Sequence, residues 1–242
     1  AKKCPALRKQ LQRFEVNWVE FSAMKEQLKE IGVTNVEVLP NFKRLQILSA
    51  EQLPVQWQEP FVFTMFSRVL KEKGMETAAK AITEVNGRFG KKRAVLRIYG
   101  AVENCYKEAF ELLLEQYKDC VSYMGCIPFD QSVEVLRDSY MLLFPSVYRG
   151  EGMPGTIIDA FSAGLPVIAT DWHFNGELVR NGETGYCYDW RNEELLTEHI
   201  IYAIEHPKEV NSMRKFCLKE AKKYTPDVSM KQICARMNSC KK

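Results

Sequence analysis

The chain has 242 residues, of which 46% are hydrophobic and 27% charged, the composition of an ordinary globular protein. Its 34 Lys and Arg residues only slightly outnumber its 31 Asp and Glu residues, and no arginine-rich helix accompanies the excess, so we expect no nucleic-acid partner. The sequence shows no signal peptide and no run of about 18 apolar residues, and we therefore expect a cytoplasmic protein.

The first 56 residues carry few structural elements. Strands are predicted at residues 16–20 and 36–39, with a helix between them at 22–31. Three short elements bury too little apolar surface to form a core of their own. This segment is therefore predicted to be the remnant of a neighbouring domain or an edge of the domain that follows it.

From residue 57 onward, short apolar runs alternate with amphipathic segments. Strands are predicted at residues 61–66, 94–100, 121–124, 141–145, 166–169 and 185–188. Helices are predicted at 75–85, 104–118, 130–139, 156–163, 192–205 and 227–240, with Asp130 and Thr156 as N-terminal caps. This alternation predicts an α/β fold with a doubly wound, Rossmann-like parallel sheet, in which ligands bind at the carboxyl ends of the strands.

Two acids, Glu151 and Asp159, lie eight positions apart across the loop and helix that join the fourth and fifth predicted strands. Glycine and proline interrupt regular structure at 152–155, and the N–H groups at the start of the following helix suit an anionic phosphate. This arrangement predicts a site for a sugar diphosphate. From the spacing alone, an ordinary strand-loop-helix unit with two solvated acids is an equal alternative.

The segment from Glu151 to Asp159 resembles the E-x7-E element of glycosyltransferase family 4, whose members have the GT-B fold and retain the anomeric configuration. Asp159 stands where the family usually has Glu, and Pro154 where many members have Gly. The resemblance implies that Glu151 contacts the hydroxyls of the donor sugar and that Asp159 holds the ribose. It places the diphosphate against the loop formed by Met153, Pro154, Gly155 and Thr156.

A second segment, 66–74, resembles the family's G-R-x-x-x-x-K-G pattern, with serine in place of the first glycine. The resemblance sets Arg68 and Lys73 against the donor diphosphate and makes them, with Glu151, the predicted catalytic residues. Lys71 is the nearest competitor of Lys73. The loop that contains Ile127 resembles the family loop that faces the nucleotide base. Solvated surface cations and a plain loop are the alternatives.

Metal and cofactor sites are not indicated by the sequence. The cysteines show no C-x-x-C pair, and the three histidines do not cluster, so we expect reduced structural thiols and no metal site. The eight cysteines are Cys4, Cys105, Cys120, Cys126, Cys187, Cys217, Cys234 and Cys240. Because an Asp-x-Asp motif is also missing from the sequence, we expect a metal-independent enzyme without a cofactor.

The resemblance also implies a domain organisation. Residues 1–56 would be the end of an N-terminal acceptor domain with its linker, and residues 57–242 the nucleotide-sugar-binding domain with a C-terminal crossover helix. Most of the acceptor domain is then expected to be missing from this chain, which by itself would be inactive. A peripheral association with the inner face of the membrane, with which the sequence is compatible, would be made through that missing half.

The implied activity is the transfer of a hexose, with retention, from a nucleoside-diphosphate sugar to a glycan or polyprenyl-linked acceptor. The expected donor is a UDP-sugar. Residues 170–175 are similar to the corresponding stretch of surface-polysaccharide enzymes, which makes that pathway the expected one.

Two other classes of protein stay open. A non-catalytic nucleotide-sugar-binding module, or one half of a two-chain enzyme, would have an intact donor site but no turnover without its partner. A UDP-sugar epimerase of the same architecture would release UDP and change the sugar configuration without an acceptor. A flavodoxin-like binder fits less well, because no glycine-rich fingerprint follows the first strand of the sheet.

Overall fold

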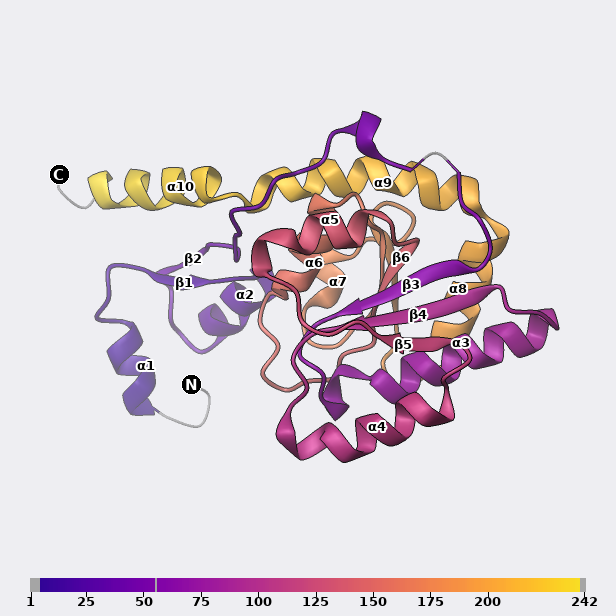
Figure 1. Cartoon of the computed structure of the whole chain (residues 1–242). Coiled ribbons are helices and arrows are strands. Elements are labelled where there is room, and N and C mark those ends of the chain that lie inside the picture. The colour runs from indigo at the N-terminus through magenta and orange to yellow at the C-terminus, as the bar shows by residue number, and fades with distance from the viewer. Residues whose placement is uncertain (1–4, 55, 240–242) are drawn as a thin grey trace.

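A six-stranded parallel sheet forms the centre of the computed structural model, which describes residues 5–54 and 56–239 (Figure 1). The strand order is β5, β4, β3, β6, β7, β8, and each neighbouring pair runs parallel. The bounds are β3 Phe61–Phe66, β4 Ala94–Tyr99, β5 Val121–Tyr123, β6 Met141–Phe144, β7 Val167–Thr170 and β8 Gly185–Tyr188. Because the order reverses between β3 and β6, the sheet is doubly wound, and the predicted fold class is confirmed.

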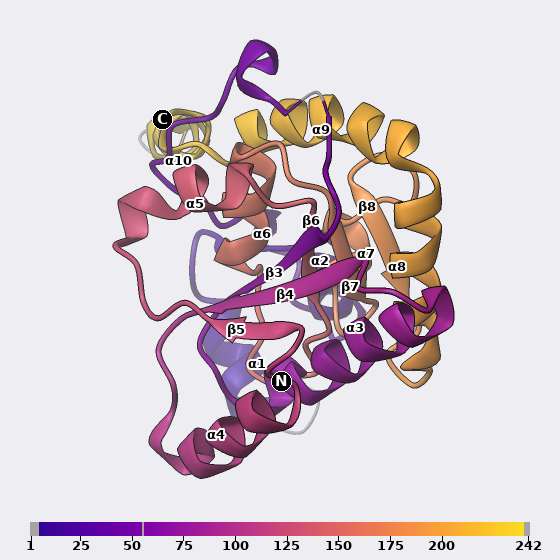
Figure 2. The ribbon, with the colours of Figure 1, turned by 45° about the vertical axis from the view of Figure 1, so that its right-hand side comes forward.

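Helices cover both faces of this sheet (Figure 2). α3, α4 and α8 pack into one core and α5 and α6 into the other, while α9 runs from the first core to the second. Their bounds are α3 Met75–Phe89, α4 Lys107–Gln116, α5 Ser132–Arg137, α6 Gly155–Ser162, α8 Glu194–Glu205 and α9 Pro207–Ala221. Successive strand residues point to opposite faces, so Met141 and Leu143 enter the first core and Leu142 and Phe144 the second.

Two helix predictions need correction, and one long helix was not predicted. α6 begins one residue before Thr156, with Pro154 as its N-cap, because the Thr156 hydroxyl donates instead to the carbonyl of Phe66 in β3. Asp130 lies in a 3-10 turn, and the N-cap of α5 is the residue after it. α9 was not predicted, since its sequence is rich in charged residues, two of which, Arg214 and Glu220, are themselves buried.

The N-terminal segment forms a smaller unit beside the sheet (Figure 1). It contains α1 (Pro5–Leu11), β1 (Asn17–Val19), α2 (Ser22–Glu30) and β2 (Val36–Val38), and β1 pairs with β2 in parallel. Phe21, at the start of α2, is buried, and its ring stacks on that of Phe174 with centroids 5.3 Å apart. Phe174 follows β7 and precedes the short helix α7 (Asn175–Leu178). The segment therefore shares the second core of the larger unit.

The last helix, α10 (Pro226–Ser239), extends from the body and returns to the N-terminal segment (Figure 1). The Gln232 amide donates to the carbonyl of Val38 at 2.6 Å, and the Arg236 guanidinium lies 3.0 Å from the Glu37 carboxylate. A helix in this region was predicted, although its last expected residue, Cys240, lies outside the described residues. The two ends of the chain are thus joined by direct contacts.

Two further observations concern the described residues. The six cysteines within residues 5–54 and 56–239 are free thiols, and Cys4 and Cys240 fall outside those ranges. Within the same ranges, no helix has the length and apolar character needed to cross a membrane.

Candidate functional site

The predicted site residues follow β3 and β6, the two strands between which the sheet order reverses. β3 and β6 pair directly, so the loops at their carboxyl ends lie side by side. Arg68 and Lys73 belong to the first loop and Glu151 to the second. In a doubly wound sheet this reversal opens the crevice in which ligands bind.

The centre of the site is an ion pair between Lys73 and Glu151. The Lys73 ammonium donates to Glu151 Oε2, which also accepts from the Ser146 hydroxyl at 2.8 Å. Only 8% of the Lys73 side chain and 11% of the Glu151 side chain are exposed. The structure therefore joins two residues that stand in different motifs of the sequence, and it fixes both against the carboxyl ends of the strands.

An aromatic ring lies between the two cations of the site. The Tyr148 ring centroid is 5.1 Å from Lys73 Nζ and 5.5 Å from the guanidinium carbon of Arg68, within reach of cation–π attraction. Arg68 is exposed and donates to Glu103 Oε1 at 3.1 Å. Hydrogen bonds to Tyr148 and Glu103 raise the pKa of Arg68, so its charge is permanent. Tyr148 had no signal in the sequence, since it lies outside both motifs.

A glycine sets the direction of Lys73. Gly74 adopts the left-handed conformation with φ of +78°, between a 3-10 turn and α3. A Cβ at this position would lie 2.5 Å from the carbonyl oxygen of Pro145, so only glycine allows the turn to approach β6 this closely. This close approach brings the Lys73 side chain to Glu151.

The second acid, Asp159, is buried in α6 and is 1% exposed. Its Oδ1 and Oδ2 accept from the Lys43 ammonium at 2.6 and 2.7 Å, and Oδ1 also accepts from the Ser132 hydroxyl at 3.0 Å. Burial raises the pKa of Asp159, and the hydrogen bonds from Lys43 and Ser132 act against this effect. Lys43 lies 116 positions away in the sequence, so no local pattern could have indicated it.

The loop before α6 is held by the N-terminal segment. Met153 is buried, its N–H donates to Glu20 Oε2 at 2.7 Å, and its carbonyl accepts from the Asn41 amide at 3.1 Å. The predicted phosphate contact through Met153 would therefore have to share this N–H with Glu20. Pro154, by contrast, has no N–H to give, and caps α6 through its backbone.

The remaining predicted contacts are those of Gly155, Thr156 and Ile127. Gly155 begins α6, where its N–H belongs to the first turn, and the N–H of Thr156 follows it. Ile127, which is half-buried, lies in the loop from β5 to α5, and the Ser132 hydroxyl at the start of α5 donates to Asp159. The structure thus brings together the residues of β3, β6 and α6, and the contact of Ile127 with the nucleotide base stays a prediction.

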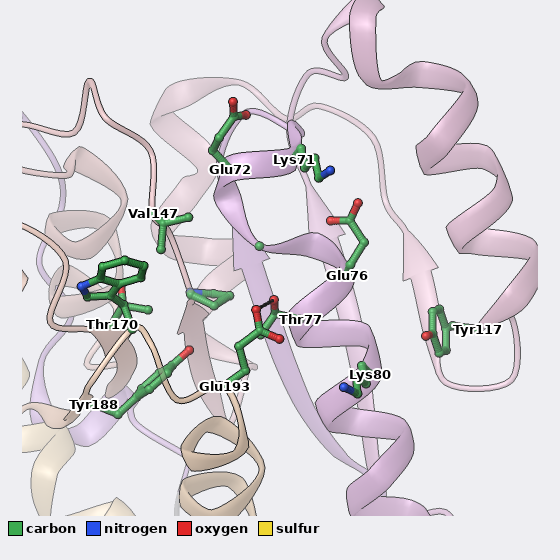
Figure 3. Close-up of a pocket in the computed structure, with 13 residues that line it drawn as sticks. Lys71, Glu72, Glu76, Thr77, Lys80, Tyr117, Val147, Thr170, Tyr188 and Glu193 are labelled. Carbon is green, nitrogen blue, oxygen red and sulfur yellow. Dashed lines mark hydrogen bonds between the residues drawn. The ribbon is translucent and has the colours of Figure 1, made fainter.

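A cavity of about 710 Å³ lies beside the turn that carries Lys73, between α3 and α8 (Figure 3). Glu72 and Gly74 line it, and across it the Thr77 hydroxyl donates to Glu193 at 3.2 Å. Neither Lys73 nor Glu151 is among its lining residues, so we do not assign the donor to it. Among the described residues, no group of three or more His, Cys, Asp or Glu side chains is arranged to hold a metal ion.

The fold and a match to a family model define the class of protein. The solved structure of HepE from Anabaena in complex with UDP matches with a TM-score of 0.80, over 99% of this chain and 70% of that chain. At 16% identity this likeness concerns the fold alone, which is the GT-B fold of glycosyltransferases. The family model described as glycosyl transferases group 1 matches residues 51–223, and this chain belongs to that family.

Two curated relatives are similar in sequence to this chain. The amylovoran biosynthesis glycosyltransferase AmsK of Erwinia amylovora is 24% identical over 168 residues, covering 68% of this chain and 39% of the relative. The UDP-Gal:alpha-D-GlcNAc-diphosphoundecaprenol alpha-1,3-galactosyltransferase of Escherichia coli is 28% identical over 162 residues, covering 65% and 40%. The chain spans about a third to a half of the length of the curated relatives that it matches first.

Proposed function

We propose that this chain is the donor-binding half of a retaining glycosyltransferase of family 4 that uses a UDP-sugar. The observation that carries the proposal is the Lys73–Glu151 pair at the point where the strand order reverses. This pair combines a cation for a phosphate with a carboxylate for a sugar hydroxyl, the two chemistries that a nucleotide-sugar presents next to each other. The family membership supports a transferase.

The diphosphate is proposed to lie against Lys73, Arg68 and the first N–H groups of α6. As the bond between the sugar C1 and the phosphate oxygen lengthens, negative charge accumulates on the leaving phosphate. Fixed cations and backbone N–H groups that face this oxygen stabilise the transition state more than the ground state. Lys73 is already held by Glu151 and Tyr148, so little reorganisation is needed to place its charge.

The sugar and the ribose are proposed to lie on opposite sides of the diphosphate. The hydrogen bonds that Glu151 accepts from Lys73 and Ser146 both reach Oε2, so Oε1 is the oxygen that we expect a sugar hydroxyl to use. Asp159 marks the ribose end of the site, eight positions further along the chain. With Glu151 bound to a cation, its proposed role is to orient the sugar.

The acceptor is proposed to be a glycan or a polyprenyl-linked sugar of surface polysaccharide biosynthesis. The printed names of the two curated relatives support this class, since one acts in amylovoran biosynthesis and the other on a diphosphoundecaprenol-linked sugar. Residues that bind the acceptor and complete the reaction would come from a further domain. The chain by itself is therefore proposed to bind the donor without turning it over.

Calorimetric titration of the chain with UDP, GDP and ADP tests the proposal. We expect selective binding of UDP that Arg68→Ala weakens. The matched control is Lys91→Ala, which removes a cation from an exposed pair with Glu59 next to the start of β3 and β4, at the opposite end of the sheet. If none of the three nucleotides binds, or if UDP binding is the same in both variants, the proposed donor site is wrong.

A further inference from the structure

The second acid of the site does not face a ligand directly. Asp159 is 1% exposed, and both its oxygens are engaged by Lys43, which is itself 27% exposed at its side chain. An approaching nucleotide therefore meets the ammonium before it meets the carboxylate. Asp159 is also one methylene shorter than the glutamate usual at this position.

Lys43 is held in this position from several sides. Its backbone N–H donates to the carbonyl of Tyr224 at 3.0 Å, and its neighbour Asn41 donates to the carbonyl of Met153 at 3.1 Å. A Cβ placed on Gly155 would lie 3.5 Å from Lys43 Cδ and 3.9 Å from its Nζ, so the side chain crosses the first residue of α6. The ammonium is thus placed at the junction between the start of α6 and Asp159.

The number of N–H donors on the Lys43 ammonium indicates which kind of ligand atom it can bind. An ammonium has three N–H donors, and within the described part of the chain its printed acceptors are the two oxygens of Asp159, which take at most two of them. The third can donate to an oxygen of a ligand. The contact offered at this end of the site is therefore a cationic donor, whereas a bare carboxylate would offer an acceptor for ribose hydroxyls.

We infer that Lys43 binds the nucleoside diphosphate of the donor and that Asp159 is a positioning residue which acts through Lys43. The inference rests on the proposed function and adds a third cation to Arg68 and Lys73. This cation comes from outside both sequence motifs and reaches the site from the segment that precedes β3. Lys43 compensates for the shorter side chain of Asp159, because its charged N–H donor takes the place of a carboxylate acceptor.

The test is a double-mutant cycle read by calorimetric titration with UDP. Lys43→Met should weaken UDP binding about tenfold, the effect of losing one charge-assisted hydrogen bond. Lys43→Met combined with Asp159→Asn should be no weaker than Lys43→Met alone, because the carboxylate has no separate contact to lose. Lys43→Arg should keep most of the affinity, and Lys91→Met is the control for the loss of a lysine.

Each other outcome overturns the assignment. Unchanged or tighter binding by Lys43→Met would mean that Lys43 makes no contact with UDP. The ribose would then displace the lysine and bind Asp159. A further tenfold loss in the double variant would mean that Asp159 contacts the ribose itself. If Lys43→Met does not fold, the double variant, which buries no lone charge, is compared with Asp159→Asn. The inference predicts weaker UDP binding by the double variant, because Asp159→Asn keeps the lysine, and equal affinities would overturn it. Failure of the unaltered chain to bind UDP would instead overturn the proposed function.

Discussion

Replacing Lys73 by methionine tests the ion pair at the centre of the site. The substitution keeps an unbranched side chain of similar size, but among the described residues it leaves the Glu151 carboxylate with only the Ser146 hydroxyl as a partner, at 2.8 Å. Removing one member of a buried pair costs about 3–5 kcal/mol. Because Glu151 keeps that hydroxyl and a little solvent contact, we expect the lower end, about 3 kcal/mol.

For a chain of this size, a loss of about 3 kcal/mol corresponds to a fall of about 6–12 °C in the melting temperature. The double variant Lys73→Met/Glu151→Gln removes both charges and should recover most of that stability. UDP binding should not recover, because the phosphate contact is lost in both variants. We expect a loss of about 10–100-fold in affinity from the missing charge-assisted contact.

Thermal melting followed by circular dichroism, together with calorimetric titration with UDP, separates the two effects. A double variant that is stable but binds UDP as well as the unaltered chain would refute the assignment of Lys73 to the phosphate. A single variant that melts at the same temperature as the unaltered chain would refute the reasoning on burial. The exposed pair formed by Lys91 and Glu59 provides the control, since Lys91→Met should change both quantities little.

Four further predictions follow from the same geometry. Arg68→Ala should weaken UDP binding about tenfold with little change in melting temperature, because this side chain is exposed; a large loss of stability would contradict its proposed role. Chelation of divalent ions should leave UDP binding unchanged in a titration with and without magnesium, and a strict need for magnesium would refute the proposed metal-independence. Gly74→Ala should destabilise the fold by about 1–3 kcal/mol in urea denaturation, whereas Gly87→Ala, whose added Cβ meets no described atom within 4 Å, should not. Burial lowers the pKa of His199, so as the pH falls the unfolded chain binds a proton at this residue before the folded chain does. The free energy of unfolding should therefore decrease as the pH falls below about 6.5. His199→Gln should reduce this decrease, as measured by urea midpoints on both sides of that pH.

Most strands of the sheet could be predicted from the sequence because they are short apolar runs with largely buried side chains. Met141–Phe144 and Val167–Thr170, for example, are buried at every position. α9 could not be predicted in the same way, since its buried positions, such as Val210, Met213 and Cys217, recur among charged residues. A helical pattern of period 3.6 that contains few large apolar residues predicts a helix only weakly, because the contacts with neighbouring helices that stabilise it are not visible in the sequence.

The site was only partly predictable for a different reason. Arg68, Lys73 and Glu151 stand in motifs, and the strand order then brings two of them into contact. Lys43 reaches Asp159 across 116 positions, and such a contact depends on how two separate segments pack. The capping role expected for Thr156 failed similarly, because its hydroxyl found a partner in β3, 90 positions earlier in the sequence.

The support of the loop before α6 by the N-terminal segment bears on how this protein can be divided. A fragment that starts at residue 57 would keep all six strands of the large sheet. It would lose Glu20 and Asn41 from Met153, and it would leave Asp159 buried without Lys43. The segment that precedes the sheet is therefore part of the candidate site, and a fragment designed to test the proposed binding of UDP should include it.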